Sequence, residues 1–109
     1  MNIPEEACLL RIFVGESDKL GHIPAYEAVV LKAREAGLAG ATVLRGVLGF
    51  GRKSVVHTAK ILRLSEDLPM VIEIVDSNEK IQAFLPIIDE MIPDGLVTLE
   101  RVRVHHPEP

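Results

Sequence analysis

The chain has 109 residues, enough for one domain, and its 48% hydrophobic and 26% charged residues are typical of a globular protein and exclude intrinsic disorder. The formal net charge of −4 argues against non-specific nucleic-acid binding, which needs clustered Lys and Arg. The N-terminus is acidic and no apolar stretch approaches the roughly 20 residues of a membrane helix, so we expect a cytoplasmic protein without membrane insertion.

The first third of the sequence predicts a strand followed by a helix. A strand is expected over residues 7–15, where Cys8, Leu10, Ile12 and Val14 alternate with Leu9, Arg11 and Phe13. Cys8, the only cysteine, is expected there as a small buried residue. A loop follows, and Pro24 suits the first turn of a helix because its missing N–H costs nothing there. The helix should end at Gly37 or Gly40, which tolerate a left-handed backbone. Its apolar stripe consists of Tyr26, Val29, Val30 and Ala33.

The middle of the sequence predicts two strands separated by a long loop. The second strand is expected over residues 41–49, the loop over residues 50–68 and the third strand over residues 70–75. The centre of the loop, HTAKILRL, fits an extended segment and a short helix equally well. The third strand is a continuous apolar run interrupted only by Glu73.

The last third predicts a second helix and a fourth strand. The helix should begin at Asp76 or Ser77, because Asp76 and Glu79 have the spacing of a capping box. Pro86 should kink the helix or start it afresh, and the residues Pro-Asp-Gly at 93–95 should end it. The fourth strand is expected over residues 96–104, and the tail over residues 105–109 should be frayed. The helix's buried stripe consists of Ile81, Phe84, Leu85, Ile88 and Ile92.

The order strand-helix-strand-strand-helix-strand predicts a single α+β domain over residues 1–109, with a ferredoxin-like four-stranded antiparallel sheet. The strands are apolar on both sides, for example Leu10 and Ile12 against Leu9 and Phe13. Two helices can cover only one face, so we expect copies of the chain to pack sheet against sheet in a closed ring. The alternative is that the 50–68 loop covers the second face.

The first candidate binding feature is the turn formed by Gly49, Phe50 and Gly51, with Arg52 beside it. Glycines let a backbone approach a ligand closely, and exposed N–H groups followed by cations can hold a phosphate. The spacing matches neither a Walker A motif nor GxGxxG. The alternative is a flexible hairpin tip with solvated charges.

A second candidate is the pair Arg101 and Arg103, which lie on one face of the predicted last strand and suit bidentate phosphate contacts. The alternative is a strand end with solvated or ion-paired arginines. In the long loop, His57 and Lys60 either contact a phosphate or are merely exposed. We predict no metal site, because His105 and His106 point to opposite faces of a strand.

We also predict no catalytic residues and no required cofactor. The four serines, Ser17, Ser54, Ser65 and Ser77, lack a motif that would activate any of them. The acidic residues beside the turns are more typical of capping groups than of a paired-carboxylate acid/base site.

The strings LAGATVLRG, GFG and LSEDLP, within a similarity that extends from Leu9 to Val104, resemble the DUF190 family, a branch of the PII-like superfamily. The resemblance implies a ferredoxin-like subunit, a homotrimer and an adenine nucleotide (AMP, ADP or ATP) in the clefts between subunits. It also implies that the 50–68 loop reports the ligand to a target protein such as a membrane transporter. The resemblance matches Gly49, Phe50 and Gly51 with the place where superfamily members approach the nucleotide, and Arg101 and Arg103 with arginines that contact phosphates from a neighbouring subunit. Together with Arg52, His57 and Lys60, which the sequence itself suggests, these residues form the predicted nucleotide site.

Two departures from PII proteins affect the expected ligand. Residues 93–95 replace a longer glycine-rich phosphate loop, so AMP or ADP is as good a candidate as ATP. The 50–68 loop has no Tyr that could be modified. Two other functions stay open: a metal-responsive trimer that resembles the CutA proteins, and a small nucleotide-hydrolysing enzyme with Glu16 or Asp18 as its base.

Overall fold

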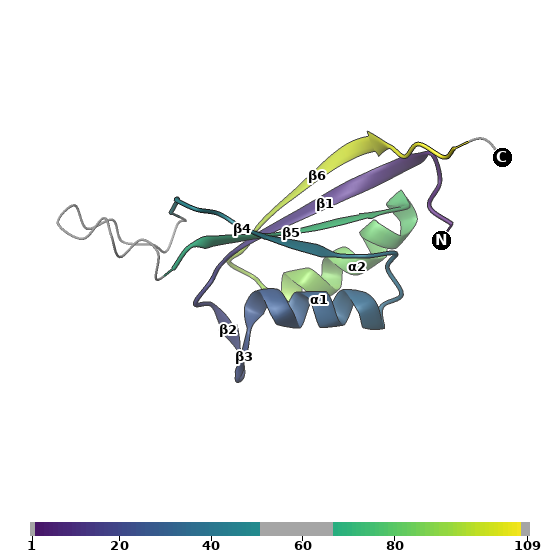
Figure 1. Ribbon diagram of the computed structural model, residues 1–109. Helices are drawn as coiled ribbons and strands as arrows, with labels where there is room; N and C mark the ends of the chain where they lie inside the picture. The colour runs from purple at the N-terminus through teal and green to yellow at the C-terminus, as the bar shows by residue number, and fades with distance from the viewer. Residues whose placement is uncertain (1, 51–66, 108–109) are drawn as a thin grey trace.

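The computed structural model describes residues 2–50 and 67–107 of the chain. They form a four-stranded sheet with two helices and a small two-stranded hairpin (Figure 1). The elements are β1 (Glu6–Gly15), β2 (Lys19–Leu20), β3 (Ile23–Pro24), α1 (Ala25–Glu35), β4 (Thr42–Arg45), β5 (Pro69–Asp76), α2 (Asn78–Met91) and β6 (Leu96–Arg103).

The main sheet has the strand order β4-β5-β1-β6, and every neighbouring pair is antiparallel. Ile12 at the centre of β1 pairs with Ile72 of β5 on one side and with Val97 of β6 on the other. Each helix connects two parallel strands, and one other strand of the sheet lies between them. Both helices lie on the same face of the sheet (Figure 1). The predicted ferredoxin-like α+β fold is therefore confirmed.

Helix α1 follows the predicted stripe closely. Val29 and Ala33 are buried against the sheet, while Tyr26 and Val30 are partly buried beside them. The helix ends as expected at a glycine: Gly37 has a φ of 80°, a left-handed conformation that residues with a side chain adopt only with strain. Pro24 does not lie in the first turn as predicted, but precedes the helix as its N-cap residue.

The start of α2 differs from the predicted capping box. The N-cap is Ser77, whose hydroxyl accepts a hydrogen bond from the Lys80 N–H at 3.2 Å. Asp76 is instead buried at the end of β5, where its carboxylate accepts hydrogen bonds from the N–H groups of Ala39 (2.9 Å) and Ser77 (2.7 Å). The local pattern assigned the Asp76 side chain to the helix N-terminus, but it accepts a hydrogen bond from Ala39, 37 residues away in the sequence. Helix α2 runs through Pro86 without starting afresh.

The second strand is shorter than the predicted residues 41–49. Pairing of β4 with β5 ends where Arg45 lies opposite Met70, followed by a last hydrogen bond of 2.8 Å from the Gly46 N–H to the Pro69 carbonyl. Strand β5 begins at Pro69, which has no N–H to donate, so the ladder cannot continue. Residues 47–50 therefore lie outside the sheet.

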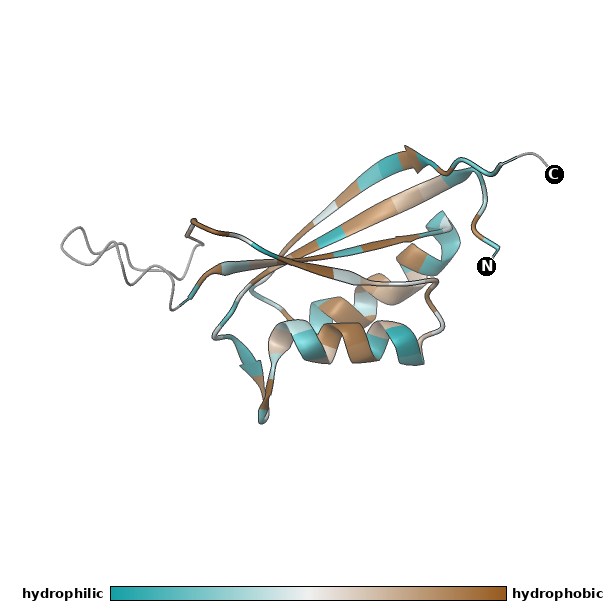
Figure 2. Ribbon diagram, viewed as in Figure 1, coloured by the Kyte–Doolittle hydropathy of each residue, from teal (hydrophilic) through white to brown (hydrophobic). Residues whose placement is uncertain are grey.

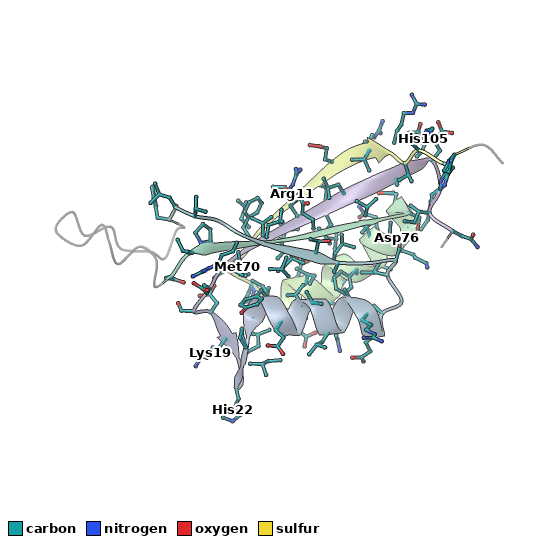
Figure 3. All side chains as sticks on the ribbon, viewed as in Figure 1. Arg11, Lys19, His22, Met70, Asp76 and His105 are labelled. Carbon is teal, nitrogen blue, oxygen red and sulfur yellow. The ribbon has the colours of Figure 1, made fainter. Side chains whose placement is uncertain are left out.

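The loop predicted before α1 contains the hairpin formed by β2 and β3. Its turn includes Gly21 with a φ of 65°, and His22 lies at its tip (Figure 3). Strands of two residues are too short to show the alternation by which a strand is recognised in a sequence.

The core lies between the helices and one face of the sheet. All its members are aliphatic except Phe84, Cys8 and Met70, and Cys8 is buried as predicted. Neither of the two described helices is long and apolar enough to cross a lipid bilayer. The buried cluster consists of Cys8, Leu10, Ile12, Val14, Val29, Ala33, Met70, Ile72, Ile74, Ile81, Phe84 and Ile88.

Neither α1 nor α2 lies over the opposite face of the sheet, which we call the open face (Figure 2). The strand register places an apolar row across its four strands, Leu44, Val71, Phe13 and Leu96 in order. Leu44 and Leu96 are about half exposed. This face is as apolar as the sequence predicts. Its residues are Ala7, Leu9, Arg11, Phe13, Thr42, Leu44, Pro69, Val71, Glu73, Val75, Leu96, Thr98, Glu100 and Val102.

Arg11 lies near the centre of the open face and points away from the helices (Figure 3). Its Nε donates a hydrogen bond to Glu73 at 2.8 Å, and Glu100 lies on its other side at 3.8 Å. The hydrogen bond to Glu73 raises the pKa of the Arg11 guanidinium above its ordinary value. The open face therefore combines an apolar surface with a small charged centre.

Candidate functional site

A pocket of about 620 Å³ lies at the end of the sheet nearest the 50–68 segment. Because the sheet is antiparallel, the end of β1 and the starts of β5 and β6 lie at the same end of the sheet. These three strand ends form one wall of the pocket. The turn after β1, the start of α1, the last residue of α2 and residues 92–95 complete the wall. Segments far apart in the sequence therefore converge at this edge.

The pocket has both apolar and charged lining residues. Its apolar lining includes Phe13, Leu20, Phe50, Pro69, Met91, Ile92 and Leu96. Its charged lining consists of the carboxylates of Asp18, Asp67 and Asp94 and the ammonium group of Lys19. Pockets of this size and mixed lining are typical of small-molecule sites, in which apolar surface supplies affinity and a few polar groups set orientation.

Two of the carboxylates are held in place by the turn after β1. Asp18 accepts a hydrogen bond from the Gly15 N–H at 2.9 Å. Asp67 accepts hydrogen bonds from the N–H (3.0 Å) and the hydroxyl (2.8 Å) of Ser17. The next residue, Leu68, accepts the Glu16 N–H through its carbonyl at 2.8 Å. The C-terminal end of the 50–68 segment is therefore fastened to the turn that lines the pocket.

Gly49 and Phe50 lie at the N-terminal end of that segment. Phe50 lines the pocket and is 70% exposed. Gly49 lies against the ring of Pro69, and a side chain there would come within 2.9 Å of the ring; the same is true of Gly46 at 2.8 Å. The glycine at 49, predicted to let the backbone approach a ligand, is thus required by this packing.

The two candidate arginines lie far from the pocket within one chain. Arg101 is five residues along β6 from Leu96, a distance of about 17 Å, and Arg103 is about 23 Å away. Arg103 forms an ion pair with Glu5 at 3.1 Å, whereas Arg101 makes no hydrogen bond or ion pair with the described residues. The structure therefore separates these arginines from the pocket that contains Phe50.

The remaining candidates are not all described. Gly51, Arg52, His57 and Lys60 lie outside the described residues, so their prediction is not tested. In the described ranges 2–50 and 67–107, no group of three or more His, Cys, Asp or Glu residues could hold a metal. Glu16, one candidate base, forms an ion pair with Arg45 at 3.1 Å.

The sequence interpretation missed the pocket residues themselves. Asp67 was interpreted only as a turn or capping group, and Asp18 was named otherwise only as an alternative catalytic base. Residues 93–95 were predicted to end the second helix and to replace a longer phosphate loop, but not to line a pocket, although each of these positions lies next to a strand end. The strand order could have indicated these residues, because the predicted antiparallel sheet places all three turns at the same end of the sheet.

A four-stranded antiparallel sheet with two helices on one face defines the ferredoxin-like class of folds. Its second and third strands in this chain, β4 and β5, are joined by a long segment, as in PII-like proteins. Comparison with solved structures supports this assignment. CPII from Thiomonas intermedia K12, described as a nitrogen regulatory PII-like protein bound to ADP, AMP and bicarbonate, matches with a TM-score of 0.66 and 16% identity, covering 94% of this chain and 97% of that one. A PII-like signalling candidate from Thermus thermophilus matches with a TM-score of 0.61 and 17% identity, covering 91% and 89%. At these identities the likeness concerns the fold.

The chain belongs to the DUF190 family, described as "Uncharacterized ACR", whose profile matches residues 7–104. A UPF0166 protein of Aquifex aeolicus is 42% identical over 96 residues, which cover 88% of this chain and 90% of the relative. A UPF0166 protein of Methanocaldococcus jannaschii is 35% identical over 104 residues, covering 94% and 95%. The family predicted from the sequence is thus confirmed.

Proposed function

We propose that this chain is a PII-like regulatory subunit that binds an adenine nucleotide without transforming it. The observation that carries the proposal is the position of the pocket, which touches both Phe50 and Asp67 at the two ends of the 50–68 segment. A ligand in contact with both ends changes the relative free energies of the conformations available to the segment. A target protein that binds the segment, such as a membrane transporter, would then respond to the ligand.

The proposed subunit acts as a homotrimer that assembles through the open face. Phe13, Pro69 and Leu96 belong both to the open face and to the pocket wall. A second copy that covers the open face would therefore also close the pocket. It could supply Arg101 and Arg103, which lie too far along β6 to reach the pocket of their own chain. Each site would then be shared between two copies.

The proposed ligand is AMP or ADP in preference to ATP. The apolar wall suits a base, and the carboxylates of Asp18 and Asp67 are acceptors for ribose hydroxyls and amino groups. Three carboxylates against one ammonium group among the described lining make the pocket a poor place for several phosphates. The description of CPII as bound to ADP and AMP supports this choice.

Isothermal titration calorimetry with AMP, ADP and ATP tests the ligand. We expect binding of AMP or ADP, and a tenfold preference for ATP would contradict the expected order. If none of the three binds to the assembled protein, the proposed function is wrong.

The shared site is tested by Arg101→Gln. Loss of a charge-assisted hydrogen bond worth about 1.5–3 kcal/mol should weaken binding roughly tenfold to a hundredfold. The matched control is Arg34→Gln, which removes an exposed arginine of α1 and should leave affinity unchanged. Equal affinity of the Arg101→Gln variant and the unmodified chain would exclude Arg101 from the site.

A further inference from the structure

The charged centre of the open face is incompletely paired within one chain. Arg11 uses its Nε in the hydrogen bond to Glu73, and its two terminal nitrogens donate no hydrogen bond to the described residues. The distance from Arg11 Nη1 to the Glu100 carboxylate is 3.8 Å, beyond hydrogen-bond range. Glu100 itself is 59% exposed. The two terminal nitrogens of Arg11 and the carboxylate of Glu100 are therefore available for hydrogen bonds with another chain.

The surroundings of these groups make pairing necessary once the face is covered. Leu9 and Val75 lie beside them on the open face, and Arg11 is the one cation among its described residues. A charge that is removed from water must find an opposite charge and hydrogen bonds, or burial becomes strongly unfavourable. A purely apolar partner would leave Glu100 without a donor.

We propose that Arg11 of each copy pairs with Glu100 of the neighbouring copy, so that the charged centre selects a second copy of this chain as the occupant of the open face. The inference rests on the proposed self-association. Each copy supplies one Arg11 to a neighbour on one side and one Glu100 to a neighbour on the other side. This arrangement allows a closed symmetric ring in which every interface is alike. Glu73 remains the partner of Arg11 within its own chain.

This pairing predicts an unusual result when two weakened variants are mixed. Arg11→Met removes the donor and Glu100→Gln removes the acceptor's charge, so each variant alone should self-associate about tenfold more weakly than the unmodified chain, or worse. In a mixed ring of three copies, one interface pairs Arg11 of the second variant with Glu100 of the first, and one brings Met against Gln. The third interface joins two copies of the same variant and is weakened as in an unmixed ring. Mixed rings therefore contain fewer unpaired charges than unmixed rings.

Native mass spectrometry measures the composition of the rings, with one chain of each mixture labelled with ¹⁵N. The two variants are incubated together until unmodified chains treated in the same way have exchanged. We expect mixed rings in excess of the statistical proportion. The control is Glu90→Gln, an exposed carboxylate of α2, mixed with the unmodified chain, and it should give statistical rings.

The outcomes separate this inference from the proposed function. Statistical mixing of the two variants, or unchanged self-association of each, would mean that the charged centre acts only within its own chain, while the trimer and its nucleotide site would stand. A chain that stays monomeric at every concentration would overturn both the pairing and the shared site.

Discussion

Replacing Leu96 by Asp should dissociate the assembly while leaving the subunit folded. Leu96 is 55% exposed at one end of the apolar row on the open face. Complete burial of a leucine side chain contributes about 1.5–3 kcal/mol, so covering the exposed half contributes about 1 kcal/mol per copy. A carboxylate in its place would cost several kcal/mol to bury. A sum of about 4 kcal/mol raises the dissociation constant of an interface roughly a thousandfold.

Sedimentation velocity over a range of concentrations measures the assembly, and far-ultraviolet circular dichroism checks the fold. The matched control is Leu31→Asp, because Leu31 is 53% exposed but lies on α1, on the covered side of the sheet. Leu44→Asp, at the other end of the row, should act like Leu96→Asp. If both open-face variants sediment like the unmodified chain, or Leu31→Asp dissociates the assembly equally well, the open face is not the interface.

Three further substitutions test the contacts that support the site. Asp76→Ala leaves two partly buried N–H groups without an acceptor at the buried end of β5 and should lower the free energy of unfolding by about 2–4 kcal/mol in urea titrations; a loss below about 0.5 kcal/mol, the size of an ordinary surface change, would contradict this role. Gly49→Ala should destabilise the fold by about 1–3 kcal/mol through contact with Pro69, and Pro69→Ala in the same chain should recover most of that loss; simple additivity of the two changes would refute the contact. Ser17→Ala removes the hydroxyl bond to Asp67 and should change stability by less than about 1 kcal/mol, yet accelerate proteolytic cleavage within residues 50–68; unchanged cleavage would show that this bond does not restrain the segment.

The parts of the fold that the sequence predicted correctly are the long elements, in which the pattern of apolar residues continues over many positions. The long apolar strand β1 and the apolar stripes of α1 and α2 contain enough repeats to be recognised directly in the sequence. The end of β4 was overestimated because Val47 and Leu48 continue a strand-like composition after pairing has stopped. What stops it is the missing N–H of Pro69, which belongs to another strand.

The site was predicted only in part for a similar reason. Phe50 of the predicted turn lines the pocket, whereas Gly49 packs against Pro69. Asp67 carries no local signal that it will bond to Ser17, which is 50 residues away in the sequence. Such contacts depend on which strand ends meet at an edge, and this becomes known only once the order of the strands is known.

The fastening at the base of the 50–68 segment has a consequence for how partner choice could change. The bonds from Gly46 to Pro69 and from Glu16 to Leu68 close the sheet before the segment begins. Loop-closure entropy grows slowly, by about 0.6 kcal/mol for each doubling of length, so the subunit should fold with inserts of very different length and composition. Replacing this segment with that of a relative would then change the surface that binds the target protein and leave the pocket intact. Related subunits could in this way acquire different target proteins without a change of fold.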